Sequence, residues 1–184
     1  MERLDLATYS IYFDGIAGAL GSFLAGGSWS QIFILVDENT ERDCLPVLMM
    51  MVPALSSATV ISIPSGEQHK NIATCNTIWE QLSKHRADRY ALLLNLGGGV
   101  IGDMGGFVAG TYKRGIDFAQ LPTSLLAMVD ASVGGKTGVD LNAIKNAIGL
   151  FNNPQHVFIE PAFLHTLPHR QLVSGVAEMI KHGL

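Results

Sequence analysis

Basic residues are few in this sequence, and they are scattered. The 184 residues include 12 lysines and arginines against 16 aspartates and glutamates, for a net charge of −4 and a pI of about 5.8. No basic run is present that could neutralise the phosphates of a nucleic acid or lie on an anionic lipid surface. We therefore expect no nucleic acid and no membrane as a partner.

Cysteines and long apolar runs are also sparse. Cys44 and Cys75 have no metal-binding spacing, and without an apolar signal region near Met1 they are typical of reduced intracellular thiols. No uncharged stretch reaches the length that spans a bilayer. The sequence does have 48% hydrophobic residues and 20 glycines, enough for a domain with a substantial core. We expect a cytoplasmic globular protein.

One glycine-rich turn organises the chain. The apolar run 91–96 leads directly into Gly97-Gly98-Gly99, and a helical pattern of small residues follows. Glycines at a strand-to-helix turn allow a ligand to approach the backbone, and the free N–H groups of the helix favour a phosphate. The spacing Gly97-x-Gly99-x-x-Gly102 matches a dinucleotide-binding pattern. The turn is therefore either the diphosphate site of a nucleotide cofactor or a packed glycine turn without a ligand.

Strand and helix patterns alternate along the first two thirds of the chain. We predict strands over 8–13, 31–36, 58–63 and 89–96 and helices over 16–24, 41–51, 72–85 and 100–112. This alternation predicts an α/β fold, with a mainly parallel Rossmann-like sheet and helices on both faces. The small residues within 100–112 suggest close packing against another helix or a ligand.

Three acidic positions have alternative readings at this stage. Asp37 follows a predicted strand and is either a helix cap or a ribose ligand. Glu67 and Lys70, in a polar turn, are on sequence alone more typical of a solvated ion pair. Asp117 lies twenty residues after Gly97, where a ribose-binding acid would be expected, but it begins a strand instead of ending one. We therefore interpret the spacing of Asp117 as a chance match, and not as evidence for a ribose ligand.

Polar side chains among small residues dominate the region after residue 120. Gly135-Lys136-Thr137 resembles a phosphate loop, but Asp130 occupies the position at which the Walker spacing requires a glycine. Lys136 and Lys145 have no acidic neighbour in the sequence. They predict an anionic small-molecule substrate.

Several ordered motifs together resemble 3-dehydroquinate synthase. They are the run from Gly97 to Asp103, Tyr112 to Gly115, Pro122-Thr123, Asp130 to Lys136, Lys145-Asn146 and Ala177 to Gly183. The resemblance implies an enzyme of the shikimate pathway that uses NAD and a divalent metal, zinc or cobalt. It would eliminate phosphate from 3-deoxy-arabino-heptulosonate 7-phosphate and close the ring of 3-dehydroquinate, with transient oxidation by NAD. The implied assembly is a homodimer.

The resemblance also implies roles for individual residues. Cofactor contacts would come from Asp37, Asn39, Glu67, Lys70, Gly98, Gly99, Val100, Asp103, Thr123 and Ser124. Catalytic or substrate contacts would come from Asp130, Lys136, Lys145, Asn146, Lys181 and Arg114, the last from the neighbouring subunit. Glu178 would be a metal ligand. Ser124, Met128, Ala131 and Asp140-Leu141 depart from the family's usual residues, which puts detailed contacts in doubt but not the resemblance.

The family's second, helical domain supplies two histidine ligands, and no matching His-Thr-x-Gly-His motif occurs here. Pro168 would interrupt a helix between His165 and His169, so we read both as surface or interdomain residues, and His182 as no ligand. We expect an NAD-binding α/β domain over 1–166 and, over 167–184, the first helix of a truncated C-terminal domain. Such a fragment would show no turnover alone.

Alternative functions remain open on sequence alone. A related sugar-phosphate cyclase or a metal-dependent polyol dehydrogenase would share the architecture, although Lys136, Lys145-Asn146 and Arg114 favour a phosphorylated acid over a simple polyol. A catalytically silent nucleotide-binding or interaction module is the third possibility.

Overall fold

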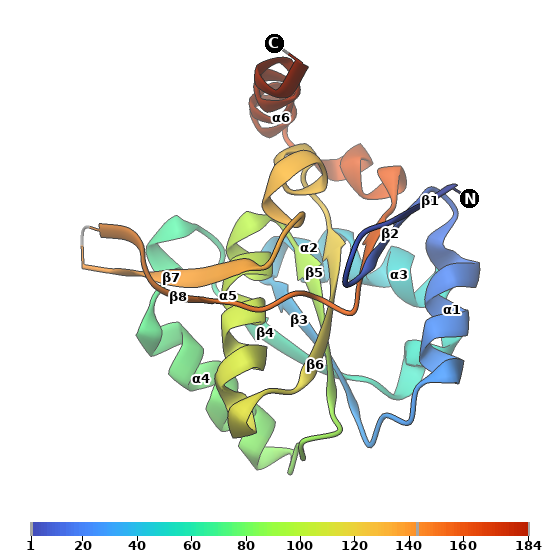
Figure 1. Ribbon diagram of the computed structural model, residues 1–184, viewed down its shortest axis with the longest axis vertical. Helices are drawn as coiled ribbons and strands as arrows, with labels where there is room; N and C mark the ends of the chain where they lie inside the picture. Colours follow the sequence, from blue (N-terminus) through green and yellow to red (C-terminus); the bar gives the residue numbers. More distant parts are fainter. Residues whose placement is uncertain (1, 143, 184) are drawn as a thin grey trace.

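The computed structural model describes residues 2–142 and 144–183 (Figure 1). Its strands are β1 (Glu2–Asp5), β2 (Ser10–Phe13), β3 (Ile32–Asp37), β4 (Thr59–Ile63), β5 (Leu92–Gly97), β6 (Asp117–Pro122), β7 (Lys136–Leu141), β8 (Ile144–Phe151) and β9 (His156–Ile159). Its α-helices are α1 (Ile16–Gly26), α2 (Glu38–Asp43), α3 (Leu45–Met51), α4 (Ile72–Lys84), α5 (Gly99–Thr111) and α6 (His169–Gly183). Short helical segments are η1 (Pro53–Ser57), η2 (Glu67–His69), η3 (Tyr112–Arg114), the π-helical η4 (Ala127–Ala131) and η5 (Pro161–Thr166).

A seven-stranded sheet forms the centre of the described ranges. Its strand order is β1-β2-β9-β6-β5-β3-β4, and every pairing is parallel except that of β1 with β2. The chain runs from β3 outward to β4, then returns past β3 to β5 and continues to β6. The strand order therefore reverses between β3 and β5, and such a switch point is where open α/β sheets bind ligands. The predicted fold class is confirmed.

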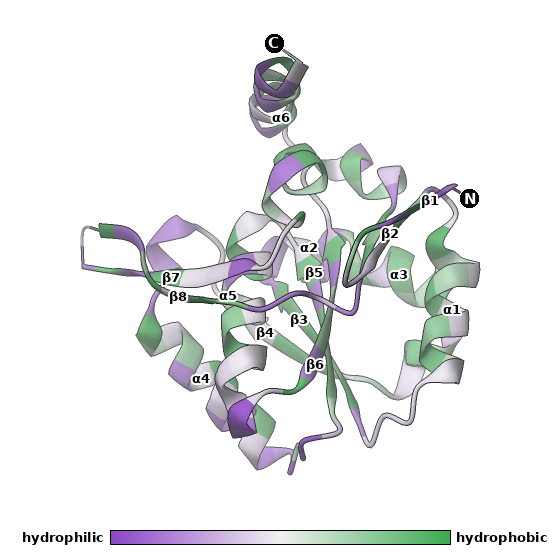
Figure 2. Ribbon diagram, viewed as in Figure 1, coloured by the Kyte–Doolittle hydropathy of each residue, from purple (hydrophilic) through white to green (hydrophobic). Residues whose placement is uncertain are grey.

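Strand β3 shows how the sheet separates two cores. Ile34 and Val36 belong to the core that α1 and α3 cover, whereas Phe33 and Leu35 belong to the core under α4 and α5. All four side chains are fully buried. Successive residues of a strand point to opposite faces, so a continuous apolar run is what a sheet covered on both faces requires. The central strands are accordingly largely hydrophobic in Figure 2.

Three glycines of α5, Gly105, Gly106 and Gly110, pack against strands, which corrects the expectation of a neighbouring helix at these positions. A Cβ on Gly105 would overlap the side chain of Asn95 in β5, and one on Gly106 would overlap Thr137 in β7. Gly110 faces Leu150 of β8 in the same way. The missing side chains let α5 lie close to both β5 and the β7–β8 hairpin.

Two further predictions about elements need correction. The helix expected over 41–51 is two helices that meet at Cys44, and the first begins three residues earlier, at Glu38. Pro46 lies in the first turn of the second helix, where the missing N–H is tolerated. The prediction also omitted β1, β9 and the antiparallel β7–β8 hairpin, which forms a separate two-stranded sheet.

The last helix contacts the domain through a narrow face. Gly175 is its buried residue, and a Cβ there would lie 2.5 Å from Leu125 Cβ. Val173, Val176 and Ile180 are exposed. In Figure 1, α6 lies at the top of the molecule, beyond the compact body of the sheet. No helix within 2–142 and 144–183 has both the length and the apolar character needed to cross a membrane.

Candidate functional site

The carboxyl ends of four parallel strands border one open pocket, which we call pocket 1. Asp37 ends β3, Ser65 and Gly66 follow β4, Gly98 follows β5, and Thr123 follows β6. Pocket 1 has a volume of about 370 Å³ and reaches the start of α6 at Gln171. Asn39 and Ser124 complete the predicted cofactor residues that line it. The switch point of the sheet and the predicted cofactor site thus coincide.

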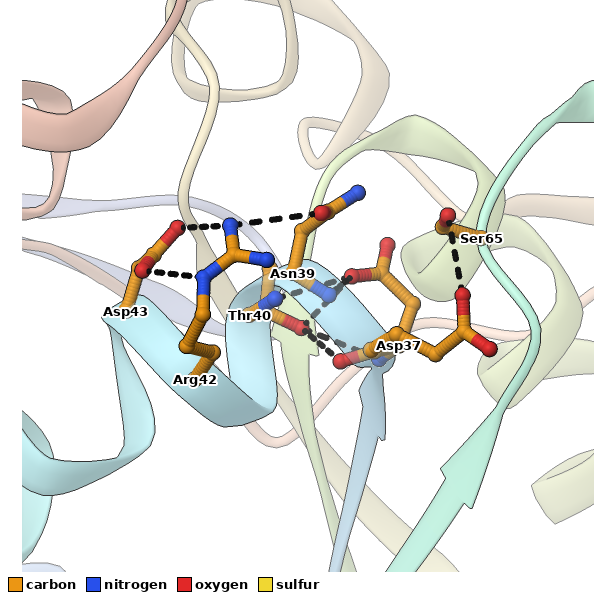
Figure 3. A network of polar contacts seen from close by, with 7 residues as sticks. Asp37, Asn39, Thr40, Arg42, Asp43 and Ser65 are labelled. Atoms are coloured by element: carbon orange, nitrogen blue, oxygen red, sulfur yellow. Dashed lines mark hydrogen bonds and ion pairs between the residues drawn. The ribbon is translucent and has the colours of Figure 1, made fainter.

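Asp37 caps α2, and its second carboxylate oxygen has no hydrogen-bond partner among the described residues. Its Oδ1 accepts hydrogen bonds from the backbone N–H groups of Asn39 at 3.0 Å and Thr40 at 2.9 Å. The Thr40 hydroxyl in turn lies 2.9 Å from the Asp37 backbone nitrogen and accepts its hydrogen bond, which completes a capping box (Figure 3). The Oδ2 atom of Asp37 takes part in none of these bonds. The cap reading is confirmed, and it leaves the carboxylate able to accept from a ribose hydroxyl.

Arg42 and Asp43 form the outer rim of pocket 1. Two hydrogen bonds, of 2.8 and 2.6 Å, join the Arg42 guanidinium to the Asp43 carboxylate, and a third, of 3.4 Å, reaches Asn39 (Figure 3). On the opposite side Ser65 donates to the Glu38 carboxylate at 3.4 Å. This rim is polar and exposed, as expected for the open end of a nucleotide site.

The glycine turn presents backbone, with no side chain, to pocket 1. Within the described residues no side chain caps α5 at Gly98, so the first-turn N–H groups remain available to an anion. A Cβ at Gly98 would lie 3.3 Å from Ser124 Oγ, and one at Gly97 would lie 2.5 Å from Ile101 Cβ. Gly99 and Val100 begin α5 just beyond the pocket lining. The turn is thus packed tightly and also open to a ligand.

A second pocket, pocket 2, lies between α5 and the β7–β8 hairpin. It has a volume of about 400 Å³, and Asp103, Lys136 and Asn146 line it together with the exposed ring of Phe151. Asp103 is one helical turn beyond Gly99, which directly follows Gly98 of pocket 1, so the first turn of α5 runs from pocket 1 toward pocket 2. Three residues predicted from separate motifs are therefore brought together.

Lys70 is not a solvated partner of Glu67, contrary to the reading from sequence. Its side chain is only 5% exposed, and its ammonium lies 2.5 Å from Asp103 Oδ2 and 2.6 Å from Asn146 Oδ1. Burial raises the pKa of the Asp103 carboxyl, and the Lys70 ammonium partly offsets that rise. The ammonium thus supplies the positive charge that a buried carboxylate needs.

Glu67 pairs instead with Lys145. The Lys145 ammonium donates to Glu67 Oε1 at 3.0 Å on the surface, and this hydrogen bond raises the pKa of Lys145. Lys145 has no acidic neighbour in sequence, but the fold gives it one from 78 residues away. An exposed pair of this kind is weak, so the ammonium remains available to an anionic ligand.

Three potential metal ligands gather where α6 meets η4. Asp130, Glu178 and His182 each offer an atom within 4.8 Å of the others, and theirs is the only group of this kind in the described part of the chain. Lys181 donates to Glu178 Oε1 at 2.7 Å, and this bond lowers the pKa of Glu178. Two carboxylates and an imidazole form a donor set that suits zinc and similar divalent ions.

Other candidates lie apart from these groups. His165 and His169 are exposed and outside the metal-type cluster, in accordance with their reading as surface residues. Arg114 lies at the far end of α5 and lines neither pocket. Cys44 and Cys75 are buried free thiols, and burial raises their pKa values to about 11 and about 12. Both thiols are therefore protonated and unreactive near neutral pH.

A sequence model described as 3-dehydroquinate synthase N-terminal matches residues 60–174. That range contains the glycine turn, Lys70, Asp103 and all of pocket 2. The chain belongs to the 3-dehydroquinate synthase family. The 3-dehydroquinate synthase of Parabacteroides distasonis is 47% identical over 165 residues, which cover 90% of this chain and 46% of that protein. The chain spans about half the length of such relatives.

Solved structures of related enzymes share the fold. A structure of 2-deoxy-scyllo-inosose synthase complexed with carbaglucose-6-phosphate, NAD+ and Co2+ aligns with a TM-score of 0.88 at 24% identity, covering 98% of this chain and 51% of the other. The 2-epi-5-epi-valiolone synthase of Streptomyces hygroscopicus, with NAD+ and Zn2+ bound, aligns with a TM-score of 0.81 at 26% identity over the same shares. The 3-dehydroquinate synthase family fold therefore accounts for nearly the whole chain.

Sequence reasoning missed several residues that line pocket 1. Ser65 and Gly66 follow the end of β4, and the rule that selected Asp37 and Gly98 could have found them. Gln171 lines pocket 1 only because of where α6 packs, and no local sequence pattern indicates that packing. His182 lies 3.4 Å from Glu178 and 3.5 Å from Asp130, which the prediction that it is no ligand does not anticipate. The four-residue spacing from Glu178 on one helix face was the available signal.

Proposed function

We propose that this chain is the cofactor-binding half of a 3-dehydroquinate synthase. The observation that carries the proposal is pocket 1, which joins an uncapped glycine turn to a carboxylate at the switch point of the sheet. Membership of the family and 47% identity to a protein of that name support this activity over a related cyclase. The enzyme would be a phosphate-eliminating lyase of aromatic amino acid biosynthesis.

The residues of pocket 1 fit NAD. The Gly98 backbone and the first N–H groups of α5 would hold the diphosphate, since no side chain of the described residues caps them and Gly98 lines pocket 1 beside Ser124. Asp37 Oδ2 and Asn39 would hold the adenosine ribose. Thr123 and Ser124 would continue toward the nicotinamide end, with Asp103 one turn along α5. When bound, NAD would supply a reversible hydride acceptor for a substrate hydroxyl.

Asp130, Glu178 and His182 fit a divalent metal. Their ligand atoms are already close together, and two anionic groups face one imidazole. A bound zinc or cobalt would supply a Lewis acid for the hydroxyl that is oxidised. The residues' own contribution is to orient the donors: Lys181 holds the Glu178 carboxylate, and the packing of Gly175 against Leu125 fixes α6 over η4.

Pocket 2 would receive the anionic substrate. Lys136 lines it and Lys145 lies on the neighbouring strand, and Asn146 adds an amide for hydrogen bonding. The ammonium groups would neutralise carboxylate and phosphate charges without themselves reacting. Arg114 lines neither pocket, so we assign it to the site of a second subunit in a homodimer. Two buried free thiols support a cytoplasmic location.

The choice between NAD and NADP tests the proposal. An Asp37 carboxylate at the ribose would accept from a 2′-hydroxyl and repel a 2′-phosphate. We expect calorimetric titration of this chain to detect NAD+ and to show at least about tenfold weaker NADP+ binding. Asp37→Asn keeps a good helix cap and should reduce the preference for NAD+ over NADP+. Equal affinity for both dinucleotides would contradict the proposed role of Asp37. No heat with either at millimolar concentration would contradict the proposal as a whole and favour a silent module.

A further inference from the structure

Most exposed cations that have no acidic partner gather at one end of the molecule. Within the described residues, the following five form no ion pair and line neither pocket: Lys84, Arg86, Arg89, Lys113 and Arg114. They lie at the ends of α4 and α5 and in the turns that follow, near the starts of β5 and β6. The lower ends of both helices are hydrophilic in Figure 2. Pocket 1 lies at the opposite edge of the sheet, where the parallel strands end.

Tyr112 joins the two basic segments. It is buried, and its hydroxyl donates to the Ala87 carbonyl at 3.2 Å. The Lys113 ammonium lies 5.7 Å from the centre of the Tyr112 ring. The pKa of Asp88 is lowered by a hydrogen bond from Ser30 and, to a smaller extent, by the positive charge of Lys113. Lys113 therefore lies beside the segment that follows α4, although the two are separate in the sequence.

Three of these cations have a backbone conformation that disfavours them. Arg86, Lys113 and Arg114 have φ values of 57°, 49° and 69°. The other non-glycine residues of positive φ in the described ranges are aspartate or asparagine, which adopt this region more readily. Arg86 follows the C-cap of α4, a position at which glycine is usual. Since glycine would suit the backbone better, the cationic side chains have a use that the fold alone does not explain.

Four of the cations have no role in the proposed site, and with a neighbouring tyrosine they form what we call the basic patch: Lys84, Arg86, Arg89, Lys113 and Tyr90. The helix dipole favours a cation at Lys84 but accounts for none of the others. Tyr90 is 64% exposed. Arginine and tyrosine are enriched among the residues that dominate binding at protein interfaces, and a guanidinium pairs with a carboxylate through two hydrogen bonds. The patch thus has the composition of a protein interface that recognises acidic groups.

The surface around the patch favours a short acidic ligand over a nucleic acid. Outside 84–90 and 112–117, acidic residues are twice as numerous as basic ones. A nucleic acid would extend beyond the patch and its phosphates would be repelled there. An acidic protein segment can end within the patch and leave the rest of the surface uncovered.

We propose that the basic patch docks an acidic segment of a partner protein. Carboxylates of the segment would pair with the arginines, and an apolar side chain beside them would cover the ring of Tyr90. The surface is separate from both pockets, and the inference does not depend on the proposed function. Arg114, assigned above to the site of a second subunit, is not part of the patch.

Two probes of equal charge test the class of partner. One is a fluorescein-labelled peptide rich in glutamate with one phenylalanine, and the other is a labelled single-stranded oligodeoxythymidylate. In fluorescence anisotropy titrations of this chain we expect the peptide to bind more tightly than the oligonucleotide, and its affinity to fall as NaCl is added. Tyr90→Ala should weaken the peptide further, because the ring loses its contact with phenylalanine.

Glycine variants separate binding from folding. Arg86→Gly and Lys113→Gly should each weaken the peptide by at least about fivefold, the scale of one charge-assisted hydrogen bond. Both should melt no lower than wild type, because glycine suits a left-handed backbone. Arg170→Gln removes an exposed, unpaired arginine of α6 and should change peptide affinity by less than about twofold. NAD+ affinity should be the same in Arg86→Gly and wild type.

Each contrary outcome overturns the proposal. Wild type that binds no peptide, or an equal loss in Arg86→Gly and Arg170→Gln, would show that the patch recognises nothing beyond net charge. Tighter binding of the oligonucleotide would assign the patch to nucleic acid. Sedimentation that shows self-association of wild type, abolished in Arg86→Gly, would make the patch an interface between copies of this chain. None of these outcomes affects the proposed function, which NAD+ titration tests separately.

Discussion

Removing the Lys70 ammonium should make the stability of the fold depend on pH in a defined direction. In Lys70→Met the Asp103 carboxylate loses the positive charge 2.5 Å away, while burial and the negative charges of Glu67 and Asp140 still raise its pKa. Its pKa in the folded state therefore rises further above the unfolded value of about 3.9. Between these two pKa values the folded state holds a proton that the unfolded state has released.

The sign and size of the effect follow from this difference. Stability of the variant relative to wild type should fall as pH rises from the folded-state pKa of Asp103 in wild type, itself above the ordinary value, to its higher folded-state pKa in the variant, by up to about 1.4 kcal/mol per pH unit. At the upper end Asp103 is charged and unpaired. Breaking a buried pair costs about 3–5 kcal/mol, and the 21% exposure of the Asp103 side chain places the loss at or below the lower end of that range. At low pH, where Asp103 is protonated, the variant loses stability only through lost packing and one lost hydrogen bond.

Urea denaturation followed by tryptophan fluorescence measures this dependence. Wild type, Lys70→Met and Lys70→Met/Asp103→Asn would be compared between about pH 5 and pH 8. The double variant has no ionisable group at position 103, so its deficit should not grow with pH. A Lys70→Met deficit that is the same at every pH would refute the reasoning, since it would show that Asp103 does not depend on Lys70.

Three further changes test other parts of the structure. Gly105→Ala should destabilise the fold by about 1–3 kcal/mol in urea denaturation, because the new Cβ overlaps the buried side chain of Asn95. Gly175→Ala should release α6, since its Cβ would lie 2.5 Å from Leu125 Cβ, and hydrogen exchange within α6 should then accelerate while the sheet stays protected. His182→Ala should weaken Co2+ binding, followed by calorimetry, by about tenfold or more.

Controls for these changes come from the same chain. Gly21→Ala, in α1, meets nothing within 4 Å among the described residues and should be neutral or slightly stabilising. His169→Ala, outside the metal-type cluster, should leave Co2+ binding unchanged. Gly105→Ala as stable as Gly21→Ala, unchanged exchange in α6, or equal Co2+ affinity in both histidine variants would contradict the respective prediction.

The central architecture could be predicted because its signals are local. Continuous apolar runs marked β3 and β5, and turn residues after them marked the edge where Asp37 and Gly98 lie. Strand β8 could not be found in this way. Its residues Ile144 to Phe151 are mostly exposed, and burial alternates only in the second half, where Ile148 and Leu150 are partly buried, because the hairpin lies over α5 outside the main sheet.

The sequence could predict which residues belong to the site, but not which of them contact one another. Lys70 contacts Asn146, which is 76 residues away, and that pairing arises only when the hairpin packs beside the segment that contains Lys70. Local spacing favoured a Glu67–Lys70 pair. In the structure, long-range packing instead pairs Lys70 with Asp103 and Glu67 with Lys145. The contact between His182 and Glu178 is local, in contrast, because residues four apart on a helix lie on the same face.

Titration of NAD+ into wild type and Gly98→Val tests the central claim most directly. The claim is that the glycine turn at the start of α5 holds the diphosphate in pocket 1. A branched side chain at position 98 would enter the space between the turn and Ser124, while its φ of −76° requires no glycine. We predict measurable NAD+ binding by wild type and a loss of at least about tenfold in Gly98→Val. The variant should still be folded at the temperature of the titration, although it should melt lower, because valine is a poorer helix N-cap than glycine and the new side chain lies close to Ser124. Equal NAD+ affinity in the two proteins would contradict the account.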